Sequence, residues 1–590
     1  MAYEHGGMII GEVLAQRGVK TMYTLCGGHI SPILVGAKRN GIRVIDVRDE
    51  VTAVFAADAT ARMTGVPGVA AVTAGPGVTN TITAVKNAQM AQSPVLIFGG
   101  ATATILKGRG SLQDIDQLAL MKPLTKFATS VKTLSKLGPT VEKALDIAES
   151  GIPGPVFVEV PVDLLYPEPM IREQFMKEAG VEHPKNIEQK ALQLAIKGYL
   201  LRQFHQPHVP VPLPSPTSTL ASLKKSALAV AIPGAQVDKV AQLLARAQRP
   251  VLVMGSQSMV NCRDGDAVAD AVRRLGIPTW LGGVARGLLG RYSDIQFRHK
   301  RSAALKEADL VIVAGFPFDF RLGYGRGFNS KATLVAVNLN PVELRKNRRP
   351  DVAVEMHAGE FLQQLATRFQ PRDGQWQDWF STCRDREIQR DNDIAAKSGA
   401  VETLINPLQI LAKVEEAMAD DAVLIVDGGD FVATASYILR PRGPLRWLDP
   451  GVFGTLGVGG GFAIGAAACY PDSEIWLIYG DGSSAYSLAE FDTCVRHGLA
   501  PIAVVGTDAS WAQIAREQTE MLGDDIGTVL RRTDYHKVAE GYGGVGLLLD
   551  DHTKIDETLA EAKKVSASGK PVLINVQLAG TDFRKGSISI

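Results

Sequence analysis

Short apolar runs recur along the whole chain, and segments of helical length and mixed polarity separate them. Two parallel strands can be joined only through a long crossover, usually a helix, so this alternation is typical of parallel sheets covered by helices. The runs fall into three groups: TMYTLC, IRVIDV, GVAAVT, PVLIFGG and PVFVEVPV; then RPVLVMGS, IPTWLGG, ADLVIVAG and ATLVAVNLN; then DAVLIVDGG, SEIWLIYGDG, APIAVVGTD and KPVLINVQL. We therefore predict an α/β fold of three consecutive doubly wound parallel-sheet domains.

Breaks in the alternation set the predicted domain boundaries. A chain of 590 residues is too long for one hydrophobic core. We expect a first domain over residues 1–170, a central domain over 235–370 and a third domain over 401–590. Residues 171–234 and 371–400 are expected to connect these domains, the second of them through a charged and partly helical stretch.

The first connecting segment contains the Pro-rich run QPHVPVPLPSPTSTL, which can form neither a regular helix nor a strand ladder. The segment before it, IEQKALQLAIKGYLLRQF, has apolar residues at helical spacing with basic residues between them. Such a helix could lie on a membrane surface or on a partner. We favour the more frequent case, a helix that packs on its own protein.

Charge and cysteine content limit the class of function. The formal net charge of +1 gives a polyanion such as nucleic acid no general attraction. The five cysteines lie far apart, without the spacing of a zinc site or the density of a disulfide scaffold, which favours thiols in a reducing compartment. The sequence shows no signal-peptide pattern and no apolar run of membrane-spanning length. We therefore expect a soluble, cytoplasmic enzyme with a small-molecule substrate and no membrane or nucleic-acid partner.

The strongest local motif is the run GDG at residues 480–482, directly after the apolar run EIWLIY. A helix-like segment follows, and then a second apolar run that ends at Thr507 and Asp508. Both strands of a βαβ unit run in the same direction, so Asp481 and Asp508 should emerge together at the carboxyl edge of the sheet. Two such carboxylates repel each other unless a hard cation lies between them. We therefore predict a Mg²⁺ or Ca²⁺ ion at this point.

A cation in this place would attract a diphosphate group. Gly482 would let the backbone approach a phosphate closely, because it has no side chain. The start of the following helix would offer free N–H groups at Ser483 and Ser484. Gly480, just before the aspartate, belongs to the same predicted diphosphate site.

This spacing resembles the thiamine-diphosphate signature, in which GDG is followed at a similar distance by Asn-Asn or Asn-Asp. In this chain Asp508 stands in place of the usual metal-ligating Asn, which adds negative charge and keeps an oxygen ligand. The resemblance also implies that the backbone carbonyl of Ser510 completes the metal ligands of the protein. Trp511, next to it, is then assigned to the cofactor site.

A thiamine cofactor needs a carboxyl group at its aminopyrimidine ring, because tautomerisation of that ring lets its amino group remove the thiazolium C2 proton. The candidate is Glu50, at the junction of a predicted strand and an Ala-rich helix. Taken alone, Glu50 could simply complement the dipole of that helix. The family usually has His-Glu here, whereas this chain has Asp49 before Glu50.

Further loops resemble parts of the family's cofactor site. Residues 75–80, GPGVTN, resemble the GPG-x-x-N loop beneath the pyrimidine, which assigns Pro76 and Asn80 to the cofactor, and Gly28 joins them. In the third domain, the resemblance gives Leu456 the part of the apolar residue that bends the cofactor. On its own, Leu456 would be taken for a core residue.

Two more stretches of the third domain match the family. The carbonyl of Gly454 is expected to receive the aminopyrimidine amine, and Gly429, Asp430 and Phe431 match a loop that approaches the diphosphate. Glu50 thus lies in the pyrimidine-binding first domain, whereas the metal site lies in the diphosphate-binding third domain. In the family these two domains come from different subunits, so the resemblance implies at least a homodimer, and a homotetramer is common.

The resemblance extends over almost the whole chain to the acetolactate-synthase-like superfamily, with residues 167–234 as the poorest match. His29, in CGGHISP, and Gln113, in RGSLQDIDQ, resemble the active-site pair of benzaldehyde lyase. The wider sequence is still more similar to 2-hydroxyacyl-CoA lyases, whereas synthases usually carry a small residue at the position of His29. A lyase must take a proton from a 2-hydroxyl group, and a histidine suits this step. His29 directly, or Gln113 through a water, could do so, although His29 could also be a structural histidine.

The reaction implied is cleavage of the C1–C2 bond of a 2-hydroxyacyl thioester to an aldehyde or ketone and formyl-CoA, or the reverse condensation, with the thiazolium as electron sink. Arg286, Arg301 and Lys306 lie in stretches that resemble the nucleotide-contacting region of oxalyl-CoA decarboxylase and 2-hydroxyacyl-CoA lyase, and they could meet CoA phosphates. Surface charge would explain them equally well. The basic end TDFRKGSISI could close over the substrate.

Three alternatives stay open at this point. The first is an acetolactate synthase that condenses two pyruvates, with FAD or ADP in the central domain. The second is an enzyme similar to oxalyl-CoA decarboxylase. The third, which Glu50 argues against, is an inactive relative that binds the cofactor only for structure.

Overall fold

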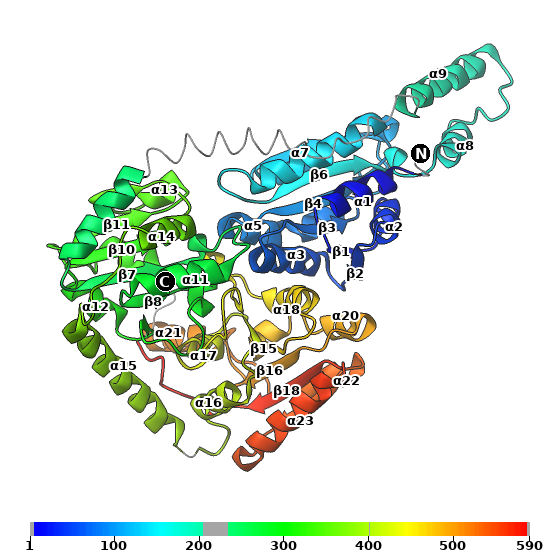
Figure 1. Ribbon diagram of the computed structural model, residues 1–590. Helices are drawn as coiled ribbons and strands as arrows, with labels where there is room; N and C mark the ends of the chain where they lie inside the picture. The colour runs from blue at the N-terminus through cyan, green and yellow to red at the C-terminus, as the bar shows by residue number, and fades with distance from the viewer. Residues whose placement is uncertain (1–4, 205–233, 401, 587–590) are drawn as a thin grey trace. The chain divides into compact units, whose positions relative to one another are not determined.

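The computed structural model describes residues 5–204, 234–400 and 402–586 of the chain. It contains three sheets, each of six parallel strands (Figure 1). The chain divides into two compact units, one formed by Met1–Ala61 and Val66–Thr219 and the other by Arg62–Gly65 and Leu220–Ile590. The first unit holds the first sheet, and the second unit holds the other two. The predicted α/β fold of three parallel-sheet domains is confirmed.

The first sheet has the strand order β2-β1-β3-β4-β6-β5. Its strands are β1 (Thr21–Leu25), β2 (Arg43–Asp46), β3 (Gly68–Val72), β4 (Val95–Ala101), β5 (Phe127–Ser130) and β6 (Val156–Pro161). Its helices are α1 (Gly6–Gln16), α2 (Ser31–Arg39), α3 (Glu50–Thr64), α4 (Pro76–Asn80), α5 (Ile82–Ala91), α6 (Gln117–Met121) and α7 (Leu137–Glu149). The chain passes from β1 outward to β2 and then returns to β3 on the other side of β1. Ligands of such sheets bind where the order reverses, outside the carboxyl ends of β1 and β3.

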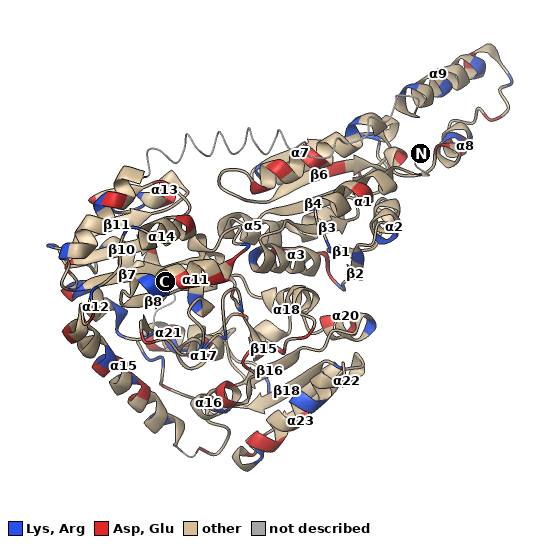
Figure 2. Ribbon diagram, in the orientation of Figure 1, with Lys and Arg blue, Asp and Glu red and all other residues tan. Residues whose placement is uncertain are grey.

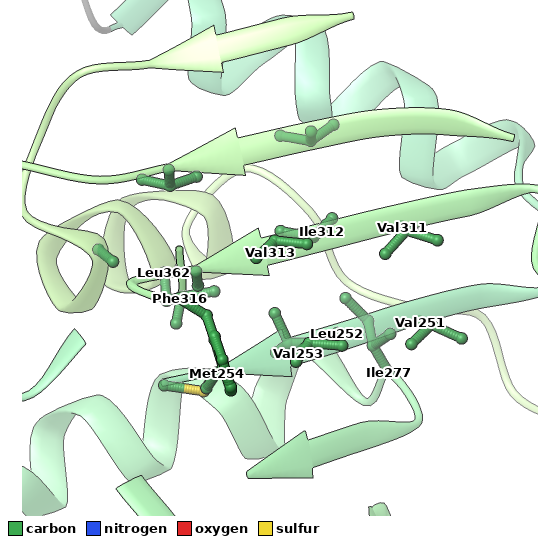
Figure 3. Packing of buried hydrophobic residues seen from close by; sticks show 14 of the residues in the cluster. Val251, Leu252, Val253, Met254, Ile277, Val311, Ile312, Val313, Phe316 and Leu362 are labelled. Carbon is green, nitrogen blue, oxygen red and sulfur yellow. The ribbon is translucent and has the colours of Figure 1, made fainter. Parts of the chain in front are cut away.

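The central sheet has the order β12-β11-β10-β7-β8-β9. Its strands are β7 (Pro250–Met254), β8 (Thr279–Leu281), β9 (Gln296–Phe297), β10 (Leu310–Ala314), β11 (Thr333–Val337) and β12 (Val352–Val354). The helices of this domain are α11 (Gly265–Leu275), α12 (Arg301–Glu307), α13 (Pro341–Leu344) and α14 (Ala358–Ala366). Figure 3 shows the core, where residues of β7 and β10 such as Leu252 and Ile312 pack beside Phe316 and Leu362. Strands buried on both faces need continuous apolar runs, which these have.

The third sheet has the order β14-β13-β15-β16-β18-β17. Its strands are β13 (Val423–Val426), β14 (Trp447–Leu448), β15 (Ile475–Gly480), β16 (Ile502–Thr507), β17 (Val545–Leu549) and β18 (Val572–Gln577). Its helices are α16 (Pro407–Ala417), α17 (Asp430–Ile438), α18 (Val458–Cys469), α19 (Asp481–Ser484), α20 (Glu490–His497), α21 (Ala512–Leu522), α22 (Tyr535–Gly541) and α23 (Ile555–Ala567). Here the order reverses between β13 and β15, so the loops after these two strands share one edge of the sheet.

Five strands of the structure were not predicted from the sequence: β5, β9, β12, β14 and β17. Each of them lies at an edge of its sheet. An edge strand has a neighbour on one side only, so it needs no continuous apolar run. Strand β14, for example, consists of two residues only.

The first connecting segment holds two helices, α8 (Glu168–Glu178) and α9 (Ile187–Phe204). Ile196 and Leu200 of α9 are buried in an apolar cluster that includes residues of α8, so this helix does pack on its own chain. Ile187 and Leu194 on its other faces are 85% and 72% exposed. The Pro-rich run that follows lies outside the described residues. Among the described helices, none has the length and apolar character needed to cross a bilayer.

The second connecting segment, which was predicted to be charged and partly helical, contains α15 (Gln377–Ser398), a helix of 22 residues. Trp379 and Cys383 near its start are buried in the core of the central domain, and Ile394 near its end is buried in the core of the third domain. The indole N–H of Trp379 also donates to the carbonyl of Pro250 in β7, at 3.0 Å. Because the segment is rich in charged residues, its sequence did not indicate that the helix packs into the cores of two domains.

Candidate active site

Glu50 is the first residue of α3 and is 7% exposed. Its Oε2 accepts a hydrogen bond from Nδ2 of Asn80, at 3.0 Å. A Cβ atom built on Gly77 would lie 3.4 Å from Oε1 of Glu50, so the turn at residues 75–80 passes directly beside this carboxyl group. The turn begins at Gly75, whose φ of +63° is a conformation that favours glycine. The structure therefore brings together the glutamate and the Gly-Pro-Gly turn that the sequence pointed to.

Asp49 stands where the family usually has a histidine, and a local hydrogen bond explains an aspartate at this position. Its Oδ1 accepts from the backbone N–H of Val51 at 3.1 Å, in the first turn of α3. A side-chain acceptor at the start of a helix satisfies an N–H group that has no partner within the helix. Asp49 itself is exposed, whereas Glu50 next to it is buried.

His29 follows β1 and lies at the same edge of the first sheet. Its Nδ1 is 3.4 Å from Oγ1 of Thr73, the residue after β3. Burial lowers the pKa of His29, so its imidazole is neutral at neutral pH and can accept a proton. A Cβ on Gly100, in β4, would lie 2.5 Å from Cβ of His29, so glycine is needed there to make room for the histidine.

Gln113 is half-buried and lies against the same turn. A Cβ on Gly75 would come within 2.9 Å of the Gln113 carbonyl oxygen. Gln113 has a left-handed φ of +63°, which is unusual for a residue other than glycine. Gly28 and Pro76 are exposed at this edge, and Tyr166 donates its hydroxyl to the Gly28 carbonyl at 2.8 Å. Together with Glu50 and Asn80, these residues form one half of the predicted cofactor site.

Asp481 and Asp508 lie at the corresponding edge of the third sheet. Strands β15 and β16 pair in parallel with Gly480 opposite Gly506, and each aspartate follows its strand. Oδ1 and Oδ2 of Asp481 accept from the N–H groups of Gly482 and Ala509, both at 2.8 Å. These bonds fix the direction of the carboxylate.

The two carboxyl groups affect each other. Burial raises the pKa of Asp481 to about 6. Burial, and then the negative charge of Asp481, raise the pKa of Asp508 to about 7. Oδ1 of Asp508 accepts from the N–H of Ser510 at 3.1 Å, which brings the Ser510 backbone to the same place. Buried, crowded oxygen donors of this kind fit a hard divalent cation.

The structure gives one packing reason for glycine at position 482. A Cβ at this position would lie 2.4 Å from the indole ring of Trp511, which was itself assigned to the cofactor site. The hydroxyl of Ser483 bonds to the N–H and carbonyl of Gly480, both at 3.1 Å. The hydroxyl of Ser484 donates to the Asp481 carbonyl at 2.8 Å. These contacts stabilise the turn that holds Asp481.

A cavity of about 360 Å³ opens beside this aspartate pair. Its lining includes Asp508, Ser510, Asp430 and Phe431. Asp430 begins α17 after Gly429, whose φ is +118°, and forms an ion pair with Arg516 at 2.6 Å. The ring of Phe431 packs against β16, where a Cβ on Gly506 would lie 2.5 Å from it.

Asp427 at the end of β13 was not predicted as a site residue. It is fully buried, and its carboxylate accepts from the N–H groups of Gly457 and Gly459 at 3.1 and 2.9 Å. These bonds hold the loop that carries the exposed Gly454 and the half-buried Leu456. An aspartate directly after a strand, in DAVLIVDGG, was the signal available in the sequence.

A second cavity, of about 540 Å³, is lined by residues of the central and third domains. Its basic lining residues are Arg286, Arg298, Lys300, Arg301, Arg390 and Arg584. The pKa of Arg286 is lowered by burial, and that of Arg301 by burial and by its neighbours Arg286 and Arg321. Within the described part of the chain, neither Arg286 nor Arg301 forms an ion pair with a carboxylate. This crowding of buried positive charge fits a polyanionic ligand.

The guanidinium groups of these two arginines are held in place by other contacts. Arg286 donates to the Ser436 carbonyl at 2.8 Å and lies over the Trp447 ring, 5.0 Å from its centroid. Arg301 donates to the Arg321 carbonyl at 2.5 Å. Lys306, the third predicted CoA contact, is exposed on α12 and does not line this cavity.

The C-terminal segment adjoins both cavities. Arg584 lines the basic cavity, and Lys585, the next residue, lines the cavity beside Asp508. Between the two cavities, the ring of Phe583 packs edge-on against Tyr437, with centroids 5.7 Å apart. The two cavities are therefore neighbours.

One cluster near the basic cavity has the composition of a metal site: His299, Glu387 and Asp391. The carboxylate of Asp391 already pairs with Arg298 at 2.7 Å, and Glu387 accepts the backbone N–H of His299 at 2.9 Å. These acceptors therefore serve an ion-pair network that orients Arg298.

Comparisons with known proteins agree with this geometry. The family model for the "Thiamine pyrophosphate enzyme, N-terminal TPP binding domain" matches residues 4–120, that for the central domain matches 237–365, and that for the "C-terminal TPP binding domain" matches 427–576. The glutamate and the aspartate pair thus lie within the two matches that are described as cofactor-binding.

Relatives match over nearly the whole chain. "2-hydroxyacyl-CoA lyase 2" of Danio rerio is 48% identical over 99% of this chain and 93% of its own length, and that of Homo sapiens is 46% identical over 99% and 92%. "Acetolactate synthase large subunit IlvG" of Mycobacterium tuberculosis is 32% identical over 97% and 95%. The resemblance recognised in the sequence is confirmed, and the chain belongs to the thiamine pyrophosphate enzyme family.

Proposed function

We propose that this chain is a thiamine-diphosphate-dependent lyase that cleaves a 2-hydroxyacyl-CoA to an aldehyde or ketone and formyl-CoA, and that also catalyses the reverse condensation. The observation that carries the proposal is His29, placed beside the Gly-Pro-Gly turn where synthases of this superfamily usually have a small residue. The relatives named 2-hydroxyacyl-CoA lyase 2 are also more similar to this chain than the acetolactate synthases are. When bound, the cofactor supplies the electron sink for the bond that breaks.

In this proposal, Glu50 would hold the aminopyrimidine end of the cofactor and supply the carboxyl group for its proton exchange, while Asn80 keeps the glutamate side chain in one orientation. His29 takes the proton from the 2-hydroxyl group as the C1–C2 bond breaks. Its lowered pKa supports this role, because an uncharged imidazole can act as a base at neutral pH. Gln113 is placed to orient the same hydroxyl group through a water.

We infer that Asp481, Asp508 and the backbone carbonyl of Ser510 hold Mg²⁺, which in turn holds the diphosphate. The raised pKa values of both aspartates support this inference, since a cation would relieve their repulsion. Leu456 and Gly454 would then meet the middle and the pyrimidine end of the cofactor.

The basic cavity would take the phosphates of CoA, with Arg286 and Arg301 as donors. CoA carries a diphosphate and a third phosphate, which together match a cavity lined by six basic side chains. The neighbouring cavity beside Asp508 would then receive the reacting end of the acyl group. The alternative occupants of the basic cavity are FAD and ADP.

We further propose a homodimer as the smallest active form, with tetramers built from it. The support is an exposed apolar surface near the diphosphate site. Helix α21 has no buried residue, and Leu522, Ile526 and Val529 are 77%, 79% and 65% exposed. Apolar surface of this kind is usually covered by a partner.

The reaction is tested by incubating the purified protein, with thiamine diphosphate and Mg²⁺, with a 2-hydroxyacyl-CoA or with pyruvate. We expect release of an aldehyde and formyl-CoA from the acyl-CoA, detected by liquid chromatography and mass spectrometry, and little acetolactate from pyruvate. Efficient formation of acetolactate without cleavage of any acyl-CoA would instead make this chain an acetolactate synthase. Oxalyl-CoA serves as the third substrate, because its decarboxylation would identify the remaining alternative.

If Asp481 and Asp508 bind a metal ion, a rise in pH should lower the stability of the metal-free protein but strengthen the stabilisation that the metal provides. Both aspartates have pKa values above the value of about 3.9 of an unfolded aspartate, so the folded protein binds their protons more tightly. Without metal, their contribution to stability is therefore present below pH 4 or so and is lost as the pH rises through about 6 and about 7.

Mg²⁺ with thiamine diphosphate should restore that stability by binding the ionised pair. We expect the rise in Tm that the two ligands produce to be larger at pH 8 than at pH 5.5, as measured by differential scanning calorimetry. In Asp508→Asn, which removes one charge of the pair, this dependence on pH should be clearly weaker. An equal ligand-induced shift at both pH values in the wild type would contradict the assignment of Asp481 and Asp508 as metal ligands.

If the basic cavity binds CoA, substitution of Arg301 should raise the KM for the acyl-CoA, whereas substitution of Lys306 should not. Replacing Arg301 by Gln removes a charged donor from the basic cavity, and a lost charge-assisted hydrogen bond of about 1.5–3 kcal/mol corresponds to a rise in KM for the acyl-CoA of about tenfold to a hundredfold. We expect kcat to change by less than about threefold.

Lys306→Gln is the matched control, because Lys306 lies on the same helix but outside the cavity. Its steady-state constants should equal those of the wild type. Equal KM values in Arg301→Gln and in the wild type would remove the CoA phosphates from this cavity.

A further inference from the structure

Glu159 is a charged residue in the middle of a buried strand. All six residues of β6 are buried, and Glu159 is 0% exposed. Figure 2 shows the charged residues mainly along the helices and loops, with the strands nearly free of them. A buried carboxylate costs several kcal/mol of stability unless other groups compensate it. Its surroundings therefore need a specific explanation.

The explanation lies in two polar contacts. The ammonium group of Lys107 forms an ion pair with Oε1 of Glu159, and Nε2 of Gln117 donates to Oε2 at 2.9 Å. The Lys107 side chain is 35% exposed, so this ion pair connects the strand to the surface. Gln117, the first residue of α6, is itself 2% exposed.

All hydrogen-bonding groups of the Gln117 side chain are used. Nε2 also donates to the Gly100 carbonyl at 3.0 Å, and Oε1 accepts from the N–H of Gly75 at 3.0 Å. A side-chain amide offers donors on one side and an acceptor on the other. If the amide turned over, its oxygen would face the Glu159 carboxylate and its NH₂ group would face the Gly75 N–H. The charge on Glu159 therefore fixes the orientation of the Gln117 amide.

Both backbone groups that Gln117 binds belong to supports of the active site. Gly75 begins the turn whose last residue, Asn80, donates to Glu50. Gly100 is the residue against which His29 packs. One buried amide thus joins the support of the glutamate to the support of the histidine.

We propose that Gln117, oriented by Glu159 and its counter-ion Lys107, is a positioning residue for the activation of the cofactor. It acts by holding the Gly75 turn so that Asn80 keeps Glu50 in its working orientation. This inference rests on the proposed role of Glu50 at the aminopyrimidine.

The test measures the step that Glu50 promotes, without any substrate. Protein loaded with thiamine diphosphate and Mg²⁺ is diluted into D₂O, quenched with acid, and the remaining C2 proton of the thiazolium is counted by NMR. The substitution is Gln117→Met, which keeps a similar volume and removes all three hydrogen bonds. We expect exchange to slow by about tenfold to a hundredfold, which corresponds to about 1.4–2.8 kcal/mol at about 1.4 kcal/mol per factor of ten.

A structural defect and a positioning defect are separated by two further measurements. The Kd of the cofactor should change by less than about threefold, because the metal and diphosphate are held in the third domain. In the double variant Gln117→Met with Glu50→Gln, exchange should be no slower than in Glu50→Gln alone, because both changes act on the same step. Gln16→Met, a change of an exposed amide in the same domain, is the control and should exchange at the wild-type rate.

Exchange in Gln117→Met within about threefold of the wild-type rate would overturn the proposal, and so would effects that multiply in the double variant. If Gln117→Met does not fold, Gln117→Glu is used. It keeps an acceptor for Gly75 but places a carboxyl against Glu159, and among the described residues Glu159 and Lys107 are the charged groups that contact position 117 or its partner.

The two carboxyls of Gln117→Glu would have to share a proton, so the ratio of its exchange rate to that of the wild type should fall as the pH rises from 5.5 to 8.5. A constant ratio would count against the proposal. A failure of the proposed function appears differently: the wild type would cleave no 2-hydroxyacyl-CoA, or Glu50→Gln would exchange as fast as the wild type.

Discussion

The repulsion between the buried carboxylate of Asp481 and the half-buried carboxylate of Asp508 is the constraint on which the third domain depends. Parallel strands β15 and β16 end side by side, and the chain places Asp481 after one and Asp508 after the other. Burial raises both pKa values toward neutrality, and the charge of Asp481 adds to the rise at Asp508. The surrounding backbone N–H groups fix the direction of these side chains, so the pair cannot relax by turning apart. In the proposed function, a divalent cation would resolve the conflict, and a cation at this edge would give a diphosphate its binding site.

The first domain has the same type of parallel sheet as the third domain, but a different set of side chains lies at the carboxyl edge of its strands. Its sheet also reverses its order beside β1, and the loops after β1 and β3 bring His29, Thr73 and the Gly75 turn together. Here the important groups are a buried glutamate and a neutral histidine. Asn80 holds the glutamate, and Gln117 holds the turn that carries Asn80. In the proposed function, the first sheet thus provides a place for proton transfer and the third sheet a place for a cation.

Much of this arrangement could be predicted from the sequence, because the central strands and the loops after them carry local signals. The apolar runs of β3, β10 and β16 are continuous because these strands are buried on both faces. Edge strands such as β9 and β14 lack such runs and were missed. Glu50 and Asp481 stand at strand–helix junctions, where a charged residue is conspicuous.

Residues whose partners lie far away in the sequence could not be recognised from local sequence patterns. Gln117 meets Glu159 across 42 positions of sequence, and Arg516 meets Asp430 across 86. The contact between Gly482 and the ring of Trp511, which leaves no room for a side chain at position 482, was not predicted either. Lys306 was grouped with Arg301 because both lie in a stretch that resembles a nucleotide-contacting region, yet Lys306 is exposed and does not line the basic cavity. These outcomes depend on tertiary packing, which spacing alone does not contain.

The central claim is that Glu50 of one subunit and Asp481 of another serve the same cofactor molecule, and mixing two inactive variants tests it directly. Glu50→Gln and Asp481→Asn should each be inactive alone. Co-expressed with different affinity tags, they should form mixed dimers in which one of the two sites has both native residues, so a random mixture should recover about a quarter of the wild-type activity. Mixed dimers, isolated through both tags, that show no activity above the two parents would contradict the claim.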